Sequence, residues 1–95
     1  RLVMPQVVEK IDLGEKHSLV QIRAPSSWTG KTLAQLNIRK KYKVNVVVIH
    51  RPLKGTNQHG KTYLIDTPLP ESMIEPGDSL LVVGTNEAIE ALPRE

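Results

Sequence analysis

The tripeptide Gly30-Lys31-Thr32 is the first candidate for chemistry, because it stands between a predicted strand and a predicted helix, where phosphate-binding loops occur. In such a loop, backbone N–H groups and the lysine surround the phosphates of a nucleotide. The pattern fails at its first position, where Pro25 replaces the required glycine, and no acidic strand follows to hold Mg²⁺. We therefore interpret the tripeptide as the start of a helix with a solvated lysine.

Metal and nucleophile chemistry have weaker candidates. The three histidines, His17, His50 and His59, fall on a turn, a strand end and a polar loop, without the short paired spacings of a metal site. The serines lack the strand-turn-helix elbow and flanking glycines of a hydrolase. The chain contains no cysteine, which removes thiol nucleophiles and cysteine zinc sites. We expect no enzyme, no metal and no cofactor.

A cluster of cations at residues 39–41, with Lys43 and Arg51 nearby, is a candidate nucleic-acid surface. The net charge is only +3, and no aromatic residues interleave the cations to stack on bases. We interpret the run as a solvated face and expect no nucleic acid, although a basic bias suits small phosphorylated ligands. Trp28, beside the predicted helix start, is interpreted as closing one end of the core.

The elements that must position these residues follow from the apolar pattern. Strands are predicted over residues 7–12 and 18–23, joined as a hairpin by a turn at Gly14. Thr29 is predicted to cap a helix over residues 32–36, and a second helical turn follows over residues 37–42. Residues 44–49 are a near-continuous β-branched run, which predicts the central strand, buried on both faces.

The second half of the chain continues with a polar loop over residues 52–60, expected to be an exposed hairpin tip, and a strand over residues 61–65. A turn at residues 76–78 precedes a buried strand over residues 80–83. Thr85 or Asn86 is predicted to cap the last helix, with Ile89 and Leu92 facing inward. The predicted fold class is α+β, an antiparallel-rich sheet with helices on one face, in the order ββ-α-βββ-α.

Length and composition indicate one small domain. The 95 residues allow a single core, and the sequence divides into a linker over residues 1–6 and a domain over residues 7–95. A chain this short buries a modest fraction of its surface, so a dimer is plausible. No apolar run approaches the roughly 20 residues that cross a bilayer. The start without methionine suggests a fragment of a longer protein, and we expect a cytoplasmic location.

Two sequence blocks resemble the TrkA-C family. The first has Gly-Lys-Thr-Leu at residues 30–33, Leu36, Ile-Arg at 38–39, Lys-Tyr-Lys-Val-Asn-Val at 41–46, and then an apolar strand. The second is Ile-Glu-Pro-Gly-Asp-Ser-Leu at residues 74–80, followed by a strand and Gly84. The resemblance covers residues 8–92. One departure is Lys43, which stands where the family has a turn glycine, and the turn is therefore expected to differ in shape.

The resemblance implies a regulatory domain that pairs as a homodimer and binds ligands in the groove between subunits. In the potassium-uptake branch of the family the groove binds cyclic di-AMP, and the matching positions here are Ile38, Arg39 and Asn45. The arginine offers a fork to a phosphate, and the asparagine offers a donor and an acceptor. Ile38, Val46 and Pro68 are expected to supply apolar walls.

The function expected from this resemblance is that of a cytosolic regulatory domain of an ion channel or transporter, one that carries potassium or another cation. The partners would be a second copy, a membrane-embedded subunit and a small nucleotide, with the domain tethered at the inner face of the cell membrane. Two alternatives stay open. One is a dimerisation module without a ligand, and the other is a nucleic-acid-binding module, which would show steep salt dependence.

Overall fold

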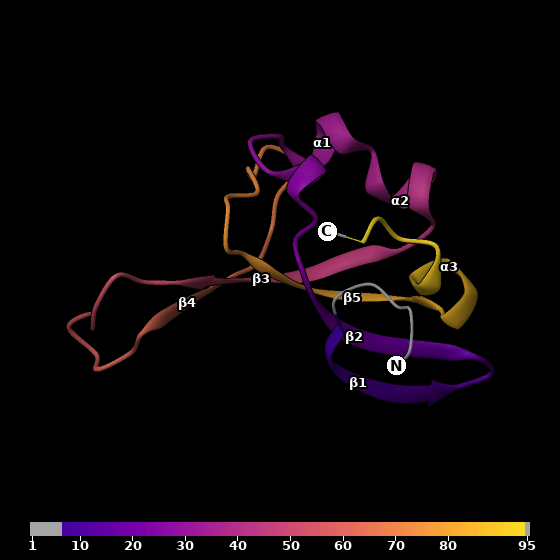
Figure 1. Ribbon diagram of the computed structural model, residues 1–95, viewed down its shortest axis with the longest axis horizontal. Coiled ribbons are helices and arrows are strands. Elements are labelled where there is room, and N and C mark those ends of the chain that lie inside the picture. The colour runs from indigo at the N-terminus through magenta and orange to yellow at the C-terminus, as the bar shows by residue number, and fades with distance from the viewer. Residues whose placement is uncertain (1–6, 95) are drawn as a thin grey trace.

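A computed structural model describes residues 7–94 of the chain, and the linker expected over residues 1–6 lies outside this range (Figure 1). The strands are β1 (Val7–Gly14), β2 (His17–Arg23), β3 (Asn45–Pro52), β4 (Tyr63–Asp66) and β5 (Ser79–Thr85). The helical elements are the 3₁₀ turn η1 (Ser26–Trp28) and the helices α1 (Leu33–Leu36), α2 (Ile38–Tyr42) and α3 (Asn86–Glu90). This order confirms the predicted pattern, with α1 and α2 in the place of the first helix. Within the described range, no helix has the length and apolar character to span a membrane.

The strands form one sheet in the order β1-β2-β5-β3-β4, and every neighbouring pair is antiparallel. The central strand is therefore β5. The prediction that residues 44–49 form a central strand buried on both faces is wrong, because β3 pairs with β4 only from Ile49 onward and Val47 is 42% exposed. The β-branched run reflects strand propensity and burial on one face rather than on two.

The core lies between one face of the sheet and the helices, as predicted for the fold class. Alternate residues of β2 and β5 point into it, because side chains of a strand alternate between the two faces. Its buried apolar members are Val20, Ile22, Trp28, Leu36, Ile38, Val44, Ile49, Ile74, Leu80, Val82, Ile89 and Leu92. Trp28 is 1% exposed and lies 5.1 Å from the ring of Tyr42, which confirms that it closes the core.

The helix ends are set by side-chain caps. Thr32 caps α1, since its hydroxyl accepts from the Gln35 N–H at 3.1 Å while the Gln35 side chain accepts from the Thr32 N–H at 2.8 Å. The expected cap, Thr29, instead donates its hydroxyl to the Ser26 carbonyl, so that prediction is wrong. Thr85 caps α3 through the Ala88 N–H, as predicted.

The β3–β4 hairpin extends from the body as an arm, seen at the left of Figure 1. Its tip is the polar loop expected over residues 52–60, and most side chains of this loop are exposed. The arm begins where β3 leaves the core after Ile49. Its base adjoins the segment over residues 67–78, which returns the chain to β5 and is called the strap below.

Candidate functional site

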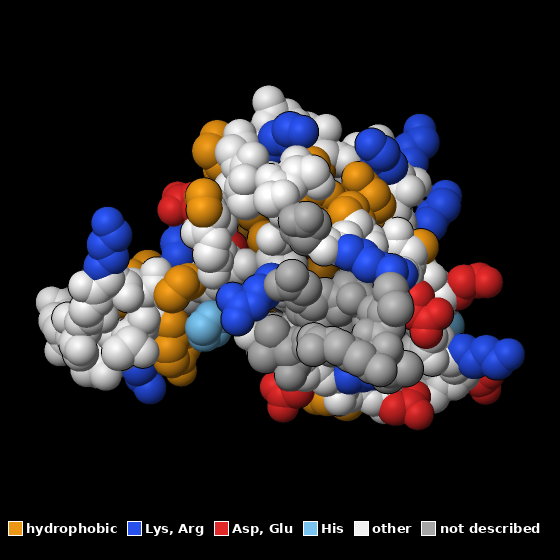
Figure 2. Space-filling view, viewed as in Figure 1, with side chains coloured by type: hydrophobic (Ala, Val, Ile, Leu, Met, Phe, Trp, Pro, Cys, Tyr) orange, Lys and Arg blue, Asp and Glu red, His pale blue; other side chains and the backbone are white. Residues whose placement is uncertain are grey.

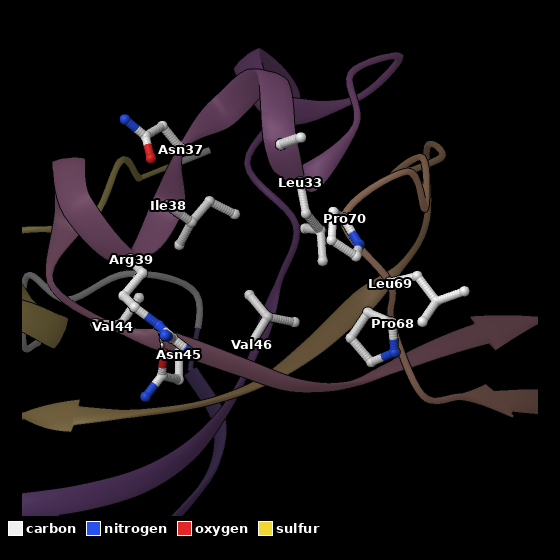
Figure 3. A pocket seen from close by; sticks show the side chains of 11 residues that line it. Leu33, Asn37, Ile38, Arg39, Val44, Asn45, Val46, Pro68, Leu69 and Pro70 are labelled. Atoms are coloured by element: carbon white, nitrogen blue, oxygen red, sulfur yellow. Dashed lines mark hydrogen bonds between the residues drawn. The ribbon is translucent and has the colours of Figure 1, made fainter.

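A groove of about 400 Å³ lies between the α1–α2 pair, β3 and the strap (Figure 3). This volume falls in the range of small-molecule pockets, roughly 300 to 1,000 Å³. The groove is lined by Leu33, Ala34, Asn37, Ile38, Arg39, Val44, Asn45, Val46, Pro68, Leu69 and Pro70. All five residues singled out from the sequence, Ile38, Arg39, Asn45, Val46 and Pro68, are therefore brought together around one cavity.

One end of the groove is polar. The Arg39 Nε–H donates to the Asn45 Oδ1 at 2.6 Å, which joins α2 to the first residue of β3. Both side chains are exposed, and among the residues described the two Nη groups of Arg39 have no hydrogen-bond partner. Asn45 thus orients the Arg39 guanidinium, and the two Nη groups of Arg39 stay available as donors. This arrangement suits a phosphate, which accepts two parallel N–H bonds from arginine.

The rest of the groove is apolar. Ile38 and Val46 lie along its middle, and Pro68, Leu69 and Pro70 form the far wall (Figure 3). Ile38 is 5% exposed, because α2 turns it toward the core, whereas Leu69 is 56% exposed. A flat apolar group next to an anion would match this sequence of surfaces, with the anion at Arg39 and the apolar group between Ile38 and Pro68.

The backbone of β3 also borders the groove. From Asn45 to Val48, β3 pairs with β5 on one side, and no described strand lies on its other side because β4 begins its pairing at Ile49. A register shift falls between Val46 and Val48, and such a bulge interrupts regular pairing and bends the strand. The groove edge therefore offers an open stretch of strand beside its side chains.

The turn that leads into the groove keeps the shape expected of glycine. Lys43 has φ 64° and ψ 28°, the left-handed conformation that glycine adopts without strain. Lys43 therefore does not take a φ suited to a non-glycine residue, and whether the turn differs in shape from that of the family stays a prediction. Its N–H bonds the Arg39 carbonyl at 3.1 Å, so the turn closes α2 and sets the spacing between Arg39 and Asn45.

The backbone of the Gly30-Lys31-Thr32 segment is hydrogen-bonded to the strap. The Gly30 N–H donates to the Ile74 carbonyl at 2.7 Å, and the Lys31 carbonyl accepts from the Ile74 N–H at 3.0 Å. These groups therefore face backbone rather than a phosphate, in agreement with the helix-start interpretation. The three histidines lie on separate elements, and no group of three or more His, Cys, Asp or Glu suited to a metal occurs among residues 7–94.

Arg51 is bound within the protein rather than displayed as a phosphate contact. Its Nε and Nη2 each donate to one carboxylate oxygen of Asp78 at 2.9 Å, and Nη2 also donates to the Met73 carbonyl at 3.0 Å. The Asp78 side chain is fully buried. The hydrogen bond to Asp78 is the main reason that the pKa of Arg51 rises above its ordinary value, and Glu75 adds to it at 3.5 Å. The nucleic-acid alternative thereby loses one of its cations.

Six of the eleven residues that line the groove were not predicted as site residues from the sequence. Leu33 was expected to face the core and also borders the cavity, and Pro70 lies two residues beyond the predicted Pro68. The two-proline segment was a usable signal, because a rigid extended chain forms a fixed wall. Leu69 carried no signal, since its exposure depends on how the strap turns at Ser72.

Comparison with known proteins gives the family. The TrkA-C domain matches residues 18–95. Among curated proteins, the chain is 38% identical over 84 residues to the Ktr system potassium uptake protein C of Bacillus subtilis (strain 168), covering 88% of the chain and 34% of that protein. It is 29% identical over 89 residues to the Ktr system potassium uptake protein A of the same organism, covering 94% and 36%. The chain thus spans about a third of the length of these relatives. With most of its length matched and both sequence blocks in place, the chain belongs to the TrkA-C domain family.

Proposed function

We propose that this domain is the regulatory module of a potassium-uptake system, that it forms a homodimer, and that its groove binds cyclic di-AMP. The relatives named as potassium uptake proteins support the transport context. The observation that carries the ligand is the Arg39–Asn45 pair at one end of an apolar groove. In this proposal the domain performs no chemistry and works in the cytoplasm, at the inner face of the membrane, beside a membrane-embedded subunit.

The charge distribution supports an anionic ligand. No Asp or Glu lies between Glu15 and Asp66, a stretch that supplies Arg39, Asn45 and most of the groove. Cations of this stretch therefore meet no carboxylate from the same stretch, and its own charges create a field that favours an anion. Such a field raises the local concentration and the association rate of an anion.

The apolar surface supports a second copy. Seven large hydrophobic side chains are exposed among the described residues, and five of them lie on β3, on β4 or in the strap: Val47, Leu64, Ile65, Leu69 and Met73. Hydrophobic side chains are visible where the arm meets the body (Figure 2). As consecutive residues of β4, Leu64 and Ile65 point to opposite faces of the sheet, so exposed apolar side chains stand on both faces of the arm. Exposed apolar clusters of this kind occur at interaction sites. In the proposed dimer the two grooves lie near the two-fold axis, which suits a two-fold ligand.

Regulation then follows from occupancy. A ligand held by both subunits binds one arrangement of the dimer better than another, and it shifts the population toward that arrangement by its difference in affinity. The attached transporter senses the arrangement rather than the ligand. Neither the groove nor the strap needs to touch the transported ion.

The experiment is calorimetric titration of the purified domain with cyclic di-AMP, with cyclic di-GMP, ATP and AMP as competitors. We expect selective binding of one cyclic di-AMP per dimer. Arg39→Ala removes a charge-assisted contact worth about 1.5 to 3 kcal/mol, so affinity should fall roughly 10- to 150-fold. Asn45→Asp keeps an acceptor for Arg39 but adds a negative charge beside the phosphate, and it should weaken binding at least as much.

Lys40→Ala is the matched control, because Lys40 is an exposed neighbour on α2 that does not line the groove. It should bind like the wild type. Equal losses in Lys40→Ala and Arg39→Ala would indicate general charge attraction rather than a site. No heat with any nucleotide, together with a firm dimer, would leave the dimerisation module as the function.

A further inference from the structure

We infer that Arg51 is a positioning residue for the groove, holding the strap at the distance from β3 that gives the groove its width. The inference rests on the proposed function only for its ligand readout. Arg51 does not line the cavity, and its effect is transmitted through the residues that it binds. Its hydrogen bonds connect β3, at the base of the arm, to the strap, which forms the far wall of the groove.

Both ends of the strap are fastened to β3. At its start, Asp66 is the register partner of Ile49, so the chain enters the strap directly from the β3–β4 ladder. Toward its end, the Arg51 guanidinium holds the Met73 carbonyl and both carboxylate oxygens of Asp78. These two anchors are two residues apart on one strand, and Pro68–Pro70 lies on the chain between them.

The other side of the strap is fastened to α1. The Ala34 N–H donates to the Pro70 carbonyl at 2.8 Å, and the Leu33 N–H donates to the Ser72 carbonyl at 3.0 Å. N–H groups in the first turn of a helix have no hydrogen-bond partner within the helix, and here the strap carbonyls accept from them. The strap therefore bridges α1 and β3, with backbone bonds on the helix side and the Arg51 side chain on the sheet side.

The two parallel hydrogen bonds from the Arg51 guanidinium fix the orientation of its contact with the strap. Asp78 accepts from Arg51 through both oxygens, and its Oδ2 also accepts from the Glu75 N–H at 2.9 Å, so the carboxylate has one orientation in its buried position. Lysine supplies a point charge without this planar geometry. Arg51→Lys should therefore keep the charge but lose part of the positioning.

The main test is the double variant Arg51→Met/Asp78→Asn. It removes both charges together, which avoids an unpaired buried carboxylate, and asparagine still accepts from the Glu75 N–H. Amide hydrogen exchange is measured on Leu33 and Ala34, whose N–H groups report the strap directly. We expect their exchange to accelerate at least tenfold while the amides of β2 and β5 keep wild-type rates. The same measurement on Arg51→Lys, which retains the charge, should give an intermediate acceleration and covers the case in which the double variant fails to fold.

The second readout is affinity for cyclic di-AMP, expected to fall at least tenfold in the double variant. Arg23→Met is the matched control, because Arg23 is an exposed arginine whose register partner, Ser79, follows Asp78 directly. It should change neither readout. Unchanged exchange at Leu33 and Ala34, or exchange that rises equally throughout the sheet, overturns the inference. If the wild type binds no nucleotide, the proposed ligand fails, and the exchange data still decide the role of Arg51.

Discussion

Ile65→Glu tests where the proposed dimer forms. Ile65 lies on β4, at the base of the arm, and its side chain is 57% exposed in the single chain. If a second copy covers this region, the exposed part of the side chain becomes buried on association. Glutamate at this position would lose that burial and would bring a charge into the contact.

The magnitude follows from the exposed fraction. Burying a whole isoleucine side chain contributes roughly 1.5 to 3 kcal/mol. Slightly more than half of that applies to Ile65, and a two-fold dimer buries the residue twice. The loss is therefore about 2 to 3 kcal/mol per dimer, which raises the dissociation constant roughly 30- to 160-fold. The cost of desolvating the carboxylate adds to this value.

The assay is sedimentation velocity over a concentration series, with Ile11→Glu as the control. Ile11 is 52% exposed on β1, at the opposite edge of the sheet, so the two substitutions change the same chemistry at nearly equal exposure. Ile65→Glu should shift the protein to monomer at concentrations where Ile11→Glu remains a dimer. A dimer insensitive to Ile65→Glu, or one broken only by Ile11→Glu, would refute the reasoning.

Three further predictions concern stability and are measured by urea unfolding. Lys43→Gly should raise the free energy of unfolding by about 0.5 to 1 kcal/mol, because it relieves a left-handed residue at φ 64° at the expense of glycine entropy; a loss of stability would contradict this account. Thr32→Ala should cost about 1 kcal/mol through loss of the cap, with Thr32→Ser close to wild type. Asp78→Ala should cost about 3 to 5 kcal/mol, since it breaks a buried pair. Because the pKa of Arg51 is raised, the arginine's contribution is fully present below its ordinary pKa and is lost as the pH rises through the raised value in strong alkali, so the Asp78→Ala cost should be constant from neutral to mildly alkaline pH.

The element order and fold class were accessible from the sequence because they depend on local signals. The turn residues after Gly14, the break at Pro25 and the side-chain cap at Thr85 each mark a boundary through residues close by in the sequence. The pairing order was not accessible. A β-branched run such as residues 44–49 reads the same whether its strand is central or partly at an edge, and only the register with β5 and β4 decides.

In the groove, too, features set by nearby residues could be predicted from the sequence, whereas features set by distant residues could not. Arg39 and Asn45 are six residues apart, across one short turn, so a sequence pattern holds both. Arg51 and Asp78 are 27 residues apart, and Arg51 read as an ordinary surface cation until the fold placed it against a buried carboxylate. Long-range ion pairs leave no spacing signal, whereas a family pattern does mark the positions proposed to face a ligand.

The central place of β5 has a consequence for how the chain reaches its native state. The β1–β2 and β3–β4 hairpins flank β5, and the strand order gives them no direct pairing with each other. The β2–β5 ladder joins residues as distant as His17 and Thr85, so the sheet closes only when the chain has been made through Thr85. Contacts this remote in sequence fold slowly. The two hairpins therefore form as separate units, and β5, the last strand of the described range, joins them.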